Sequence, residues 1–311
     1  MDQTLIAETN RRLKGLFARP AETTLATVPD GMAGKLLADL IAATGTQRLV
    51  FIARDGQRLA EVERGLRFFG PGIETIEFPA WDCLPYDRVS PHAGIVARRM
   101  AALARLVQPF KGPQVVLTTV NAALQGVPAQ DVVAAGSLSA APGNRMPMAD
   151  LVGWLEGNGF LRTSTVREPG EYAVRGGILD LFAAGTPEPV RLDFFGDTLE
   201  TIRNFDPETQ RTTNKQARID LVPVSEMTLS PESIARFRER YVALFGAADR
   251  DDLLYASVSE GRRYVGMEHW LPLFAETMET LFDHLADVPA VVDHLADEAV
   301  AERIDQIADH Y

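Results

Sequence analysis

The sequence predicts an α/β protein that carries a small α+β domain in the middle of the chain. Three short apolar runs alternate with helical patterns in the first part, which is typical of a parallel sheet covered by helices. One helix and then a series of strands without helices between them follow, which is typical of a helix packed on an antiparallel sheet. Helices and one further strand return from residue 222 onward.

The first part contains the three apolar runs at residues 48–53, 73–78 and 113–120, and each predicts a buried strand. Ser90 followed by Pro91 predicts the start of a helix, because a hydroxyl side chain caps a helix and proline suits its first position. Helical spacing then places four apolar side chains on one face: Val96, Met100, Leu103 and Val107.

The middle part begins with one amphipathic helix over residues 148–160, which the glycines at its end can terminate. Four predicted strands follow it, namely "RTSTVRE", "GGILDLF", "VRLDFF" and "TLETIRNF". Gly196 and Asp197 separate the last two strands and predict a two-residue hairpin turn.

The last part starts with Ser230 and Pro231, which again predict a capped helix start. "VPAVVDHL" predicts a strand, and the final segment predicts a helix with Val300, Ile304, Ile307 and Tyr311 on one face. No glycine, asparagine or proline ends that helix, so we expect more protein to follow.

Composition excludes several classes of protein. The net charge of −12 argues against strong nucleic-acid binding by this chain alone, since phosphate contacts need clustered Lys and Arg. Cys83 is the single cysteine, so no internal disulfide can form. The five histidines show no metal-ligand spacing, and we expect no metal and no cofactor. We find no membrane-spanning run and no signal peptide, and expect a cytoplasmic protein.

Residues 26–41 have the setting of a phosphate loop, between a predicted strand and a helix. Gly34 and Lys35 match the pattern G-x-x-x-x-G-K-[ST], but Pro29 replaces the first glycine and Leu36 replaces the hydroxyl residue. Proline removes a backbone donor and leucine cannot hold magnesium. We therefore expect a degenerate, non-functional loop and no catalytic residue.

The strand at residues 189–197 carries an apolar side chain on its polar face. Alternation directs Phe195 to the same side as Arg191 and Asp193. Phe195 either packs under a neighbouring element or serves as a handle that a partner covers. Arg175, followed by two glycines, is a second candidate, with a solvated arginine as the alternative.

Three segments resemble the bacterial transcription-repair coupling factor (Mfd) family. "FPAWDCLPYDRVSPH" is similar to its N-terminal signature loop. "GEYAVRGGILDLF" with "RLDFFGDTLETIRNFDPETQRT" is similar to its second domain and to the equivalent domain of the excision-nuclease protein UvrB, and "MEHWLPLF" to a further segment. The resemblance implies a degenerate, discontinuous helicase-like RecA/UvrB-like α/β domain at 1–135 and 222–311, with an inserted α+β domain at 136–221. It implies that residues 78–92 form a rigid loop, anchored by Trp81, Leu84 and Tyr86.

The resemblance also implies a function. The inserted domain would bind the damage-recognition ATPase UvrA through Arg175, Arg191 and Phe195, and reversing the charge of Arg191 would weaken binding without unfolding the domain. The module would be non-catalytic, with the translocase motor and the contacts to RNA polymerase and DNA in other domains of a longer protein, one of which could mask the binding face. The alternative is a nucleotide-dependent DNA-binding enzyme that resembles UvrB.

Overall fold

The computed structural model describes residues 13–17, 22–29, 31–85, 87–109, 112–249 and 251–310. The chain forms two compact units. The first unit comprises residues 1–80, 108–125 and 281–309, and the second comprises residues 81–107, 126–280 and 310–311. This grouping assigns residues 81–107 and 126–135 to the second unit. The expected division into 1–135 with 222–311, and 136–221, stays a prediction.

The first unit is built on a parallel sheet. Its strands are β1 (Arg48–Ala53), β2 (Glu74–Phe78), β3 (Gln114–Thr119) and β14 (Ala290–Val292), in the order β14-β1-β3-β2. The three strands predicted in the first part of the chain are thereby confirmed, although β2, at the edge of the sheet, is only partly buried and not fully buried as expected. The predicted strand near the C-terminal end is also confirmed, and it adds to the sheet by pairing in parallel with β1. Every side chain of β1 and β3 is buried, as expected for strands covered on both faces.

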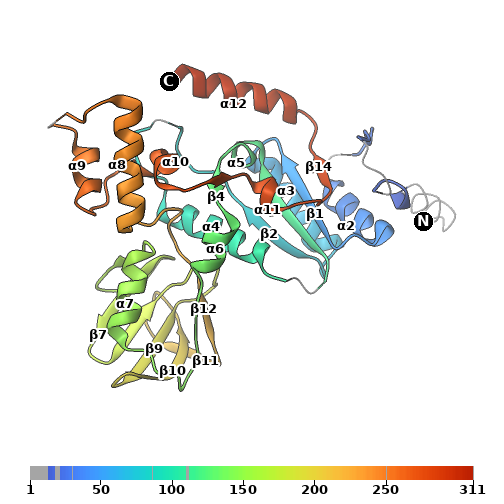
Figure 1. The fold of residues 1–311 in the computed structure, drawn as a ribbon. Helices are drawn as coiled ribbons and strands as arrows, with labels where there is room; N and C mark the ends of the chain where they lie inside the picture. Colours follow the sequence, from blue (N-terminus) through green and yellow to red (C-terminus); the bar gives the residue numbers. More distant parts are fainter. Residues whose placement is uncertain are drawn as a thin grey trace. The chain divides into compact units, whose positions relative to one another are not determined.

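Helices α2 (Ala33–Thr44) and α3 (Gly56–Phe69) pack on each other and on this sheet (Figure 1). Their contact is close because Gly34 has no side chain: a Cβ atom there would lie 2.3 Å from the backbone nitrogen of Leu66. Among the described residues this unit also contains α5 (Val120–Ala123), α11 (Leu281–His284) and α12 (Ala296–His310). The final helix is confirmed, although Tyr311 lies outside the described residues.

The second unit contains a six-stranded sheet in the order β11-β10-β9-β8-β7-β6. Its strands are β6 (Leu161–Arg162), β7 (Glu171–Arg175), β8 (Ile178–Leu181), β9 (Val190–Phe195), β10 (Thr198–Phe205) and β11 (Thr212–Gln216). Neighbours pair antiparallel except β6 with β7. Helix α7 (Met148–Gly157) packs beside the sheet, as predicted (Figure 1). The chain enters and leaves this region through β5 (Leu138–Ala140) and β12 (Ile219–Leu221), which pair with each other.

One predicted strand is largely wrong. The sequence predicts an extended segment over residues 162–168, "RTSTVRE", but only its first residue belongs to a strand. The backbone amides of Arg167 and Glu168 both donate to the side chain of Glu171, which curls this segment into a bend. Strands β7 and β11 are present although the sequence analysis does not predict them.

The remaining part of the second unit is mainly helical. Its helices are α4 (Ala93–Val107), α6 (Gln130–Ala135), α8 (Pro231–Phe245), α9 (Leu253–Ser259), the 3-10 turn η1 (Met267–Trp270) and α10 (Leu271–Phe274). A short pair, β4 (Val127–Pro128) with β13 (Met278–Glu279), joins them. Ser230 and Ser233 form a capping box at the start of α8, so the second predicted helix start is confirmed. No helix in the described ranges has the length and apolar character that crossing a bilayer requires.

The first predicted helix start is wrong. Helix α4 begins at Ala93, not directly after Ser90. The Ser90 hydroxyl instead donates to Glu268 and accepts from the backbone amide of Gly266. The Ser90 hydroxyl is therefore bonded by groups far away in the sequence and does not cap the helix as the local pattern predicted.

The segment after β2 is held by a buried charged cluster. The indole Nε1 of Trp81 donates to Glu226 at 2.9 Å, and the guanidinium of Arg99 bonds the same carboxylate and lies 5.7 Å from the centre of the Trp81 ring. The side chains of Arg99 and Glu226 are 0% and 2% exposed. This cluster ties the loop to α4 and to the chain leaving β12, which accounts for Trp81 as an anchor. Tyr86, another expected anchor, lies outside the described residues.

Candidate partner-binding face

Phe195 lies at the end of β9, next to the hairpin turn that leads into β10. Phe195 pairs with Thr198, so Gly196 and Asp197 form the predicted two-residue turn, and Gly196 has the positive φ of 58° that such a turn requires. The Phe195 side chain is 77% exposed. Of the two alternatives for this residue, the structure therefore excludes packing under a neighbouring element.

The strand register brings Arg175, Arg191 and Phe195 to one face of the sheet. Arg175 pairs with Ile178, and Ile178 pairs with Asp193. Side chains in register point to the same side, and Arg191 and Phe195 lie two residues before and after Asp193. The three predicted residues therefore share a surface.

Helix α7 covers the opposite face. The Tyr172 hydroxyl, which points away from the predicted face, donates to Glu156 on α7 at 2.5 Å. Burial, together with this bond, raises the pKa of Tyr172 to about 12. The face that carries Phe195 is thus the side of the sheet away from the helix.

Arg191 is bound within its own sheet. Its guanidinium donates to both carboxylate oxygens of Asp180, at 2.7 and 2.8 Å, and lies 5.0 Å from the centre of the Phe205 ring. The side chain of Asp180 is 2% exposed and that of Arg191 is 17% exposed. The hydrogen bond to Asp180 raises the pKa of Arg191 despite the opposing effect of burial. Arg191 therefore has a structural role whatever else it contacts.

Arg175 is more accessible. Its guanidinium donates to the backbone oxygen of Ser164 and to the hydroxyl of Thr165. No carboxylate of the described residues lies within ion-pair distance of it. Because no described carboxylate pairs with it, its charge is available to an acidic or carbonyl group of a partner.

Two further cations lie on this face and do not appear among the residues predicted from sequence. Arg203 pairs in register with Arg191, and Lys215 pairs with Arg203. Arg203 also donates to Asp193 at 2.6 Å. Alternation within β10 could have placed Arg203 on one side of its strand, but only the register shows that this is the side of Phe195.

The residues expected to form a degenerate phosphate loop lie at the start of α2 and in the turn before it. Gly34 is closed in by the backbone of α3, Lys35 forms an ion pair with Asp39, and Leu36 packs against the apolar core. The backbone oxygen of Pro29 accepts from Met32 at 3.1 Å. In each case the residue serves the packing or the backbone of this turn.

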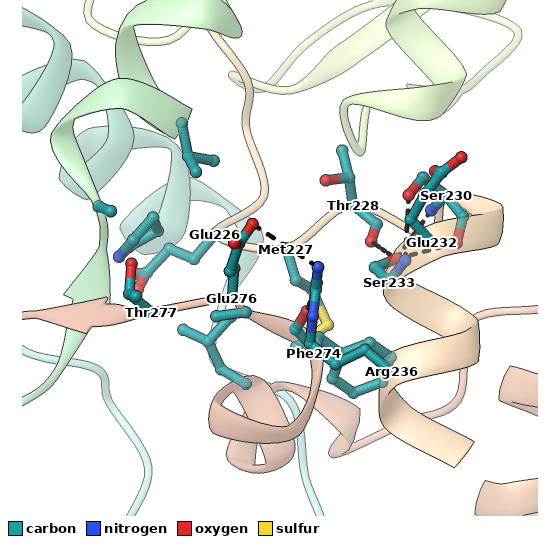
Figure 2. A pocket seen from close by; sticks show the side chains of 15 residues that line it. Glu226, Met227, Thr228, Ser230, Glu232, Ser233, Arg236, Phe274, Glu276 and Thr277 are labelled. Atoms are coloured by element: carbon teal, nitrogen blue, oxygen red, sulfur yellow. Dashed lines mark hydrogen bonds and ion pairs between the residues drawn. The ribbon is translucent and has the colours of Figure 1, made fainter. Parts of the chain in front are cut away.

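A cavity of about 210 Å³ lies in the second unit, lined by residues of α8, α10 and the segment before α8. Figure 2 shows Arg236 beside Phe274 and Glu276, and Ser233 beside Ser230 and Thr228. Glu226 on its wall is the carboxylate already bound by Arg99 and Trp81. These polar groups are bonded to one another, so the open sheet face is the better candidate site.

Cys83 lies 3.9 Å from the imidazole of His269. Burial, together with the negative charges of Asp82, Asp87 and Glu268, raises the pKa of the Cys83 thiol to about 11. A thiol of this kind stays protonated at neutral pH and is a poor nucleophile. Across the parts of the chain that the structure describes, no three His, Cys, Asp or Glu side chains are grouped as metal ligands.

Comparisons with known proteins identify the domain that carries this face. The family model of the UvrB interaction domain matches residues 138–227, which include all six strands of the sheet. The transcription-repair-coupling factor of Haemophilus influenzae is 37% identical over 232 residues, or 74% of this chain and 20% of that protein. That of Escherichia coli is 31% identical over 276 residues, or 88% of this chain and 24% of that protein. The chain thus spans between a fifth and a quarter of these relatives.

Proposed function

The chain carries a UvrB interaction domain and is homologous to the transcription-repair-coupling factors over most of its length, and from this premise we propose that it is a non-catalytic recruitment module that binds UvrA. The observation that carries the proposal is Phe195, which is 77% exposed at a hairpin tip inside the matched domain. A solvated aromatic ring gains about 1.5–3 kcal/mol when a partner buries it.

The residues of the face have different roles in this proposal. Phe195 is the apolar anchor that fills a pocket on UvrA. Arg175, which has no internal carboxylate partner, forms a charge-assisted hydrogen bond across the interface. Arg191 holds β8 to β9 through Asp180 and presents its remaining exposed edge to the partner. The face as a whole then suits an acidic surface with an apolar recess.

Three features support the absence of nucleotide hydrolysis. A phosphate loop needs backbone donors free to surround the phosphates and a hydroxyl that holds magnesium. Pro29 lacks a backbone donor and Leu36 lacks the hydroxyl. Gly34 lies in the close backbone contact between α2 and α3. These features disfavour the alternative of an enzyme that resembles UvrB.

The wider role follows from the relatives. In a longer protein of the transcription-repair-coupling factor type, this module would connect UvrA to the removal of stalled RNA polymerase. Contacts with the polymerase and with DNA, and the motor activity, would belong to other domains. The module would contribute recruitment alone.

The proposal is tested by titrating the chain with purified UvrA in a calorimeter. We expect saturable binding by the wild type, weaker binding by Phe195→Ala, and unchanged binding by Phe245→Ala. Phe245 is a matched control because it is 57% exposed on α8, outside the matched domain. Absence of binding by the folded wild type, or equal loss in both variants, would overturn the proposal.

A further inference from the structure

A second exposed aromatic site lies in the other unit, at the C-terminal end of α3. Phe68 is 78% exposed and Phe69 is 42% exposed. Their rings contact each other edge to face, with centroids 5.0 Å apart and an interplanar angle of 89°. Phe68 is as exposed as Phe195, the residue that anchors the proposed UvrA site.

Phe68 is out of phase with the buried stripe of its helix. The side chains of α3 that reach the core include Leu59, Val62 and Leu66. At about 100° per residue, Phe68 points away from this stripe and shares the solvent side of the helix with Arg64 and Arg67. Amphipathic patterning calls for a polar residue at this position.

The helix that carries the pair is firmly held. Gly34 on α2 and Gly65 on α3 allow the two backbones to meet, with the Gly65 carbonyl carbon only 2.5 Å from where a Gly34 Cβ would lie. Gly70 continues this contact beyond the helix, since a Cβ there would meet Ile73 and Ala38. The aromatic pair is therefore presented by a fixed element, which lowers the entropy lost when a partner binds.

The charge beside the rings is positive. Arg64 is exposed, and no carboxylate within the described ranges pairs with it. Arg67 is paired with Glu63 at 2.6 Å, yet 68% of its side chain is exposed. One guanidinium next to Phe68 thus has no carboxylate partner among the described residues, in a chain whose net charge is −12.

We propose that Arg64, Arg67, Phe68 and Phe69 form a second docking surface, for an acidic segment of a partner protein that places an apolar side chain against the two rings. The aromatic pair supplies the area that interfaces bury at their centre, and the arginines select carboxylates. Two arginines beside two rings would also suit single-stranded nucleic acid. A single unneutralised cation on an acidic chain favours the protein partner.

The test uses the whole chain and three labelled probes in fluorescence anisotropy. The first probe is a short peptide that alternates glutamate and leucine, the second has lysine in place of glutamate, and the third is single-stranded oligothymidine. We expect binding of the acidic peptide alone, weakened at least about five-fold by Phe68→Ser and by Arg64→Glu. Phe245→Ser is the matched control, with an exposed ring outside this unit.

Two readouts keep the result clear. Circular dichroism checks the folding of every variant, and Phe68→Ser should leave it unchanged because the Phe68 side chain is 78% exposed. In ¹⁵N spectra, the acidic peptide should shift the amides in the last turn of α3. Equal affinity of wild type and Phe68→Ser, preference for the lysine peptide or oligothymidine, or no binding would overturn the proposal. Phe195→Ala should leave this binding intact, so the outcome is independent of the UvrA site.

Discussion

Arg191 and Asp180 form a bidentate ion pair between the neighbouring strands β9 and β8, near the start of the strand that ends at the exposed Phe195. The carboxylate is almost completely buried, whereas the guanidinium is partly accessible. The pair therefore joins a residue expected at an interface to the interior of the domain. The expectation from sequence that Arg191 can be reversed in charge without cost to folding conflicts with this geometry.

We predict that Arg191→Ala lowers the free energy of unfolding by about 3 kcal/mol, because it leaves the Asp180 carboxylate buried without its cation. Urea denaturation followed by circular dichroism measures the change. Arg175→Ala, which breaks no ion pair, should cost less than about 0.5 kcal/mol. Equal midpoints for wild type and Arg191→Ala would show that the pair does not stabilise the sheet. Replacing both members, as in Asp180→Leu with Arg191→Met, should recover part of the loss.

We predict that Phe195→Ala weakens UvrA binding by about 2 kcal/mol, or roughly 30-fold, since the ring is the apolar anchor of the face. Arg175→Ala should weaken it by about 1 kcal/mol, with a smaller effect at high salt because the contact is ionic. Calorimetric titration measures both. Melting temperatures should stay at the wild-type value, in contrast to Arg191→Ala. A Phe195→Ala variant that binds normally would remove the anchor from the site.

We predict that Gly34→Ala destabilises the first unit by several kcal/mol, of the order of 3. The added Cβ would lie 2.3 Å from the Leu66 nitrogen and 2.5 Å from the Gly65 carbonyl carbon, and backbone atoms cannot rotate away. Thermal unfolding measures the effect. Gly56→Ala is the matched control, because a Cβ at Gly56 meets nothing within 4 Å. Similar melting temperatures for the two variants would contradict the close helix contact.

We predict that Glu226→Ala costs about 4 kcal/mol, since it removes the buried carboxylate that bonds the fully buried Arg99. Trp81→Phe removes one hydrogen bond to the same carboxylate and should cost about 1 kcal/mol. Denaturant unfolding compares the two. Were the tryptophan variant the more damaging, the loop would depend on the indole and not on the ion pair.

We predict that the Cys83 thiol reacts slowly with iodoacetamide below pH 9. With its pKa raised to about 11, the thiolate is only about 0.1% of the population at pH 8, compared with roughly a quarter for an unperturbed thiol. The rate should rise about ten-fold per pH unit up to pH 10. Mass spectrometry after timed alkylation measures it, with the urea-unfolded chain as reference. A rate in the folded chain equal to this reference would contradict the raised pKa.

Local sequence carried most of the secondary structure. The apolar runs of β1 and β3 could be predicted because strands buried on both faces are continuously apolar, whereas the edge strand β2 is only partly buried. The turn at Gly196 and Asp197 could be predicted because a two-residue hairpin needs a residue with positive φ. The exposure of Phe195 followed as one of two alternatives from the alternation along β9.

Long-range contacts decided what remained. The alternation of side chains along the sequence shows that Arg191 and Phe195 share a side of β9. It does not show that Asp180 pairs with Arg191, because the register is set by the contact between two strands. Ser90 has the sequence pattern of a helix cap, yet its hydroxyl forms hydrogen bonds with Glu268 and Gly266 instead. In the sequence, Gly34 matches a glycine of the phosphate-loop pattern. In the structure it lies where α2 and α3 pack closely together. By itself the sequence determined most of the segments that are helices or strands and which side chains break their patterns, since those depend on near neighbours. Only the tertiary structure decided which of those side chains are bound internally and which are left for a partner, since that depends on groups far along the chain.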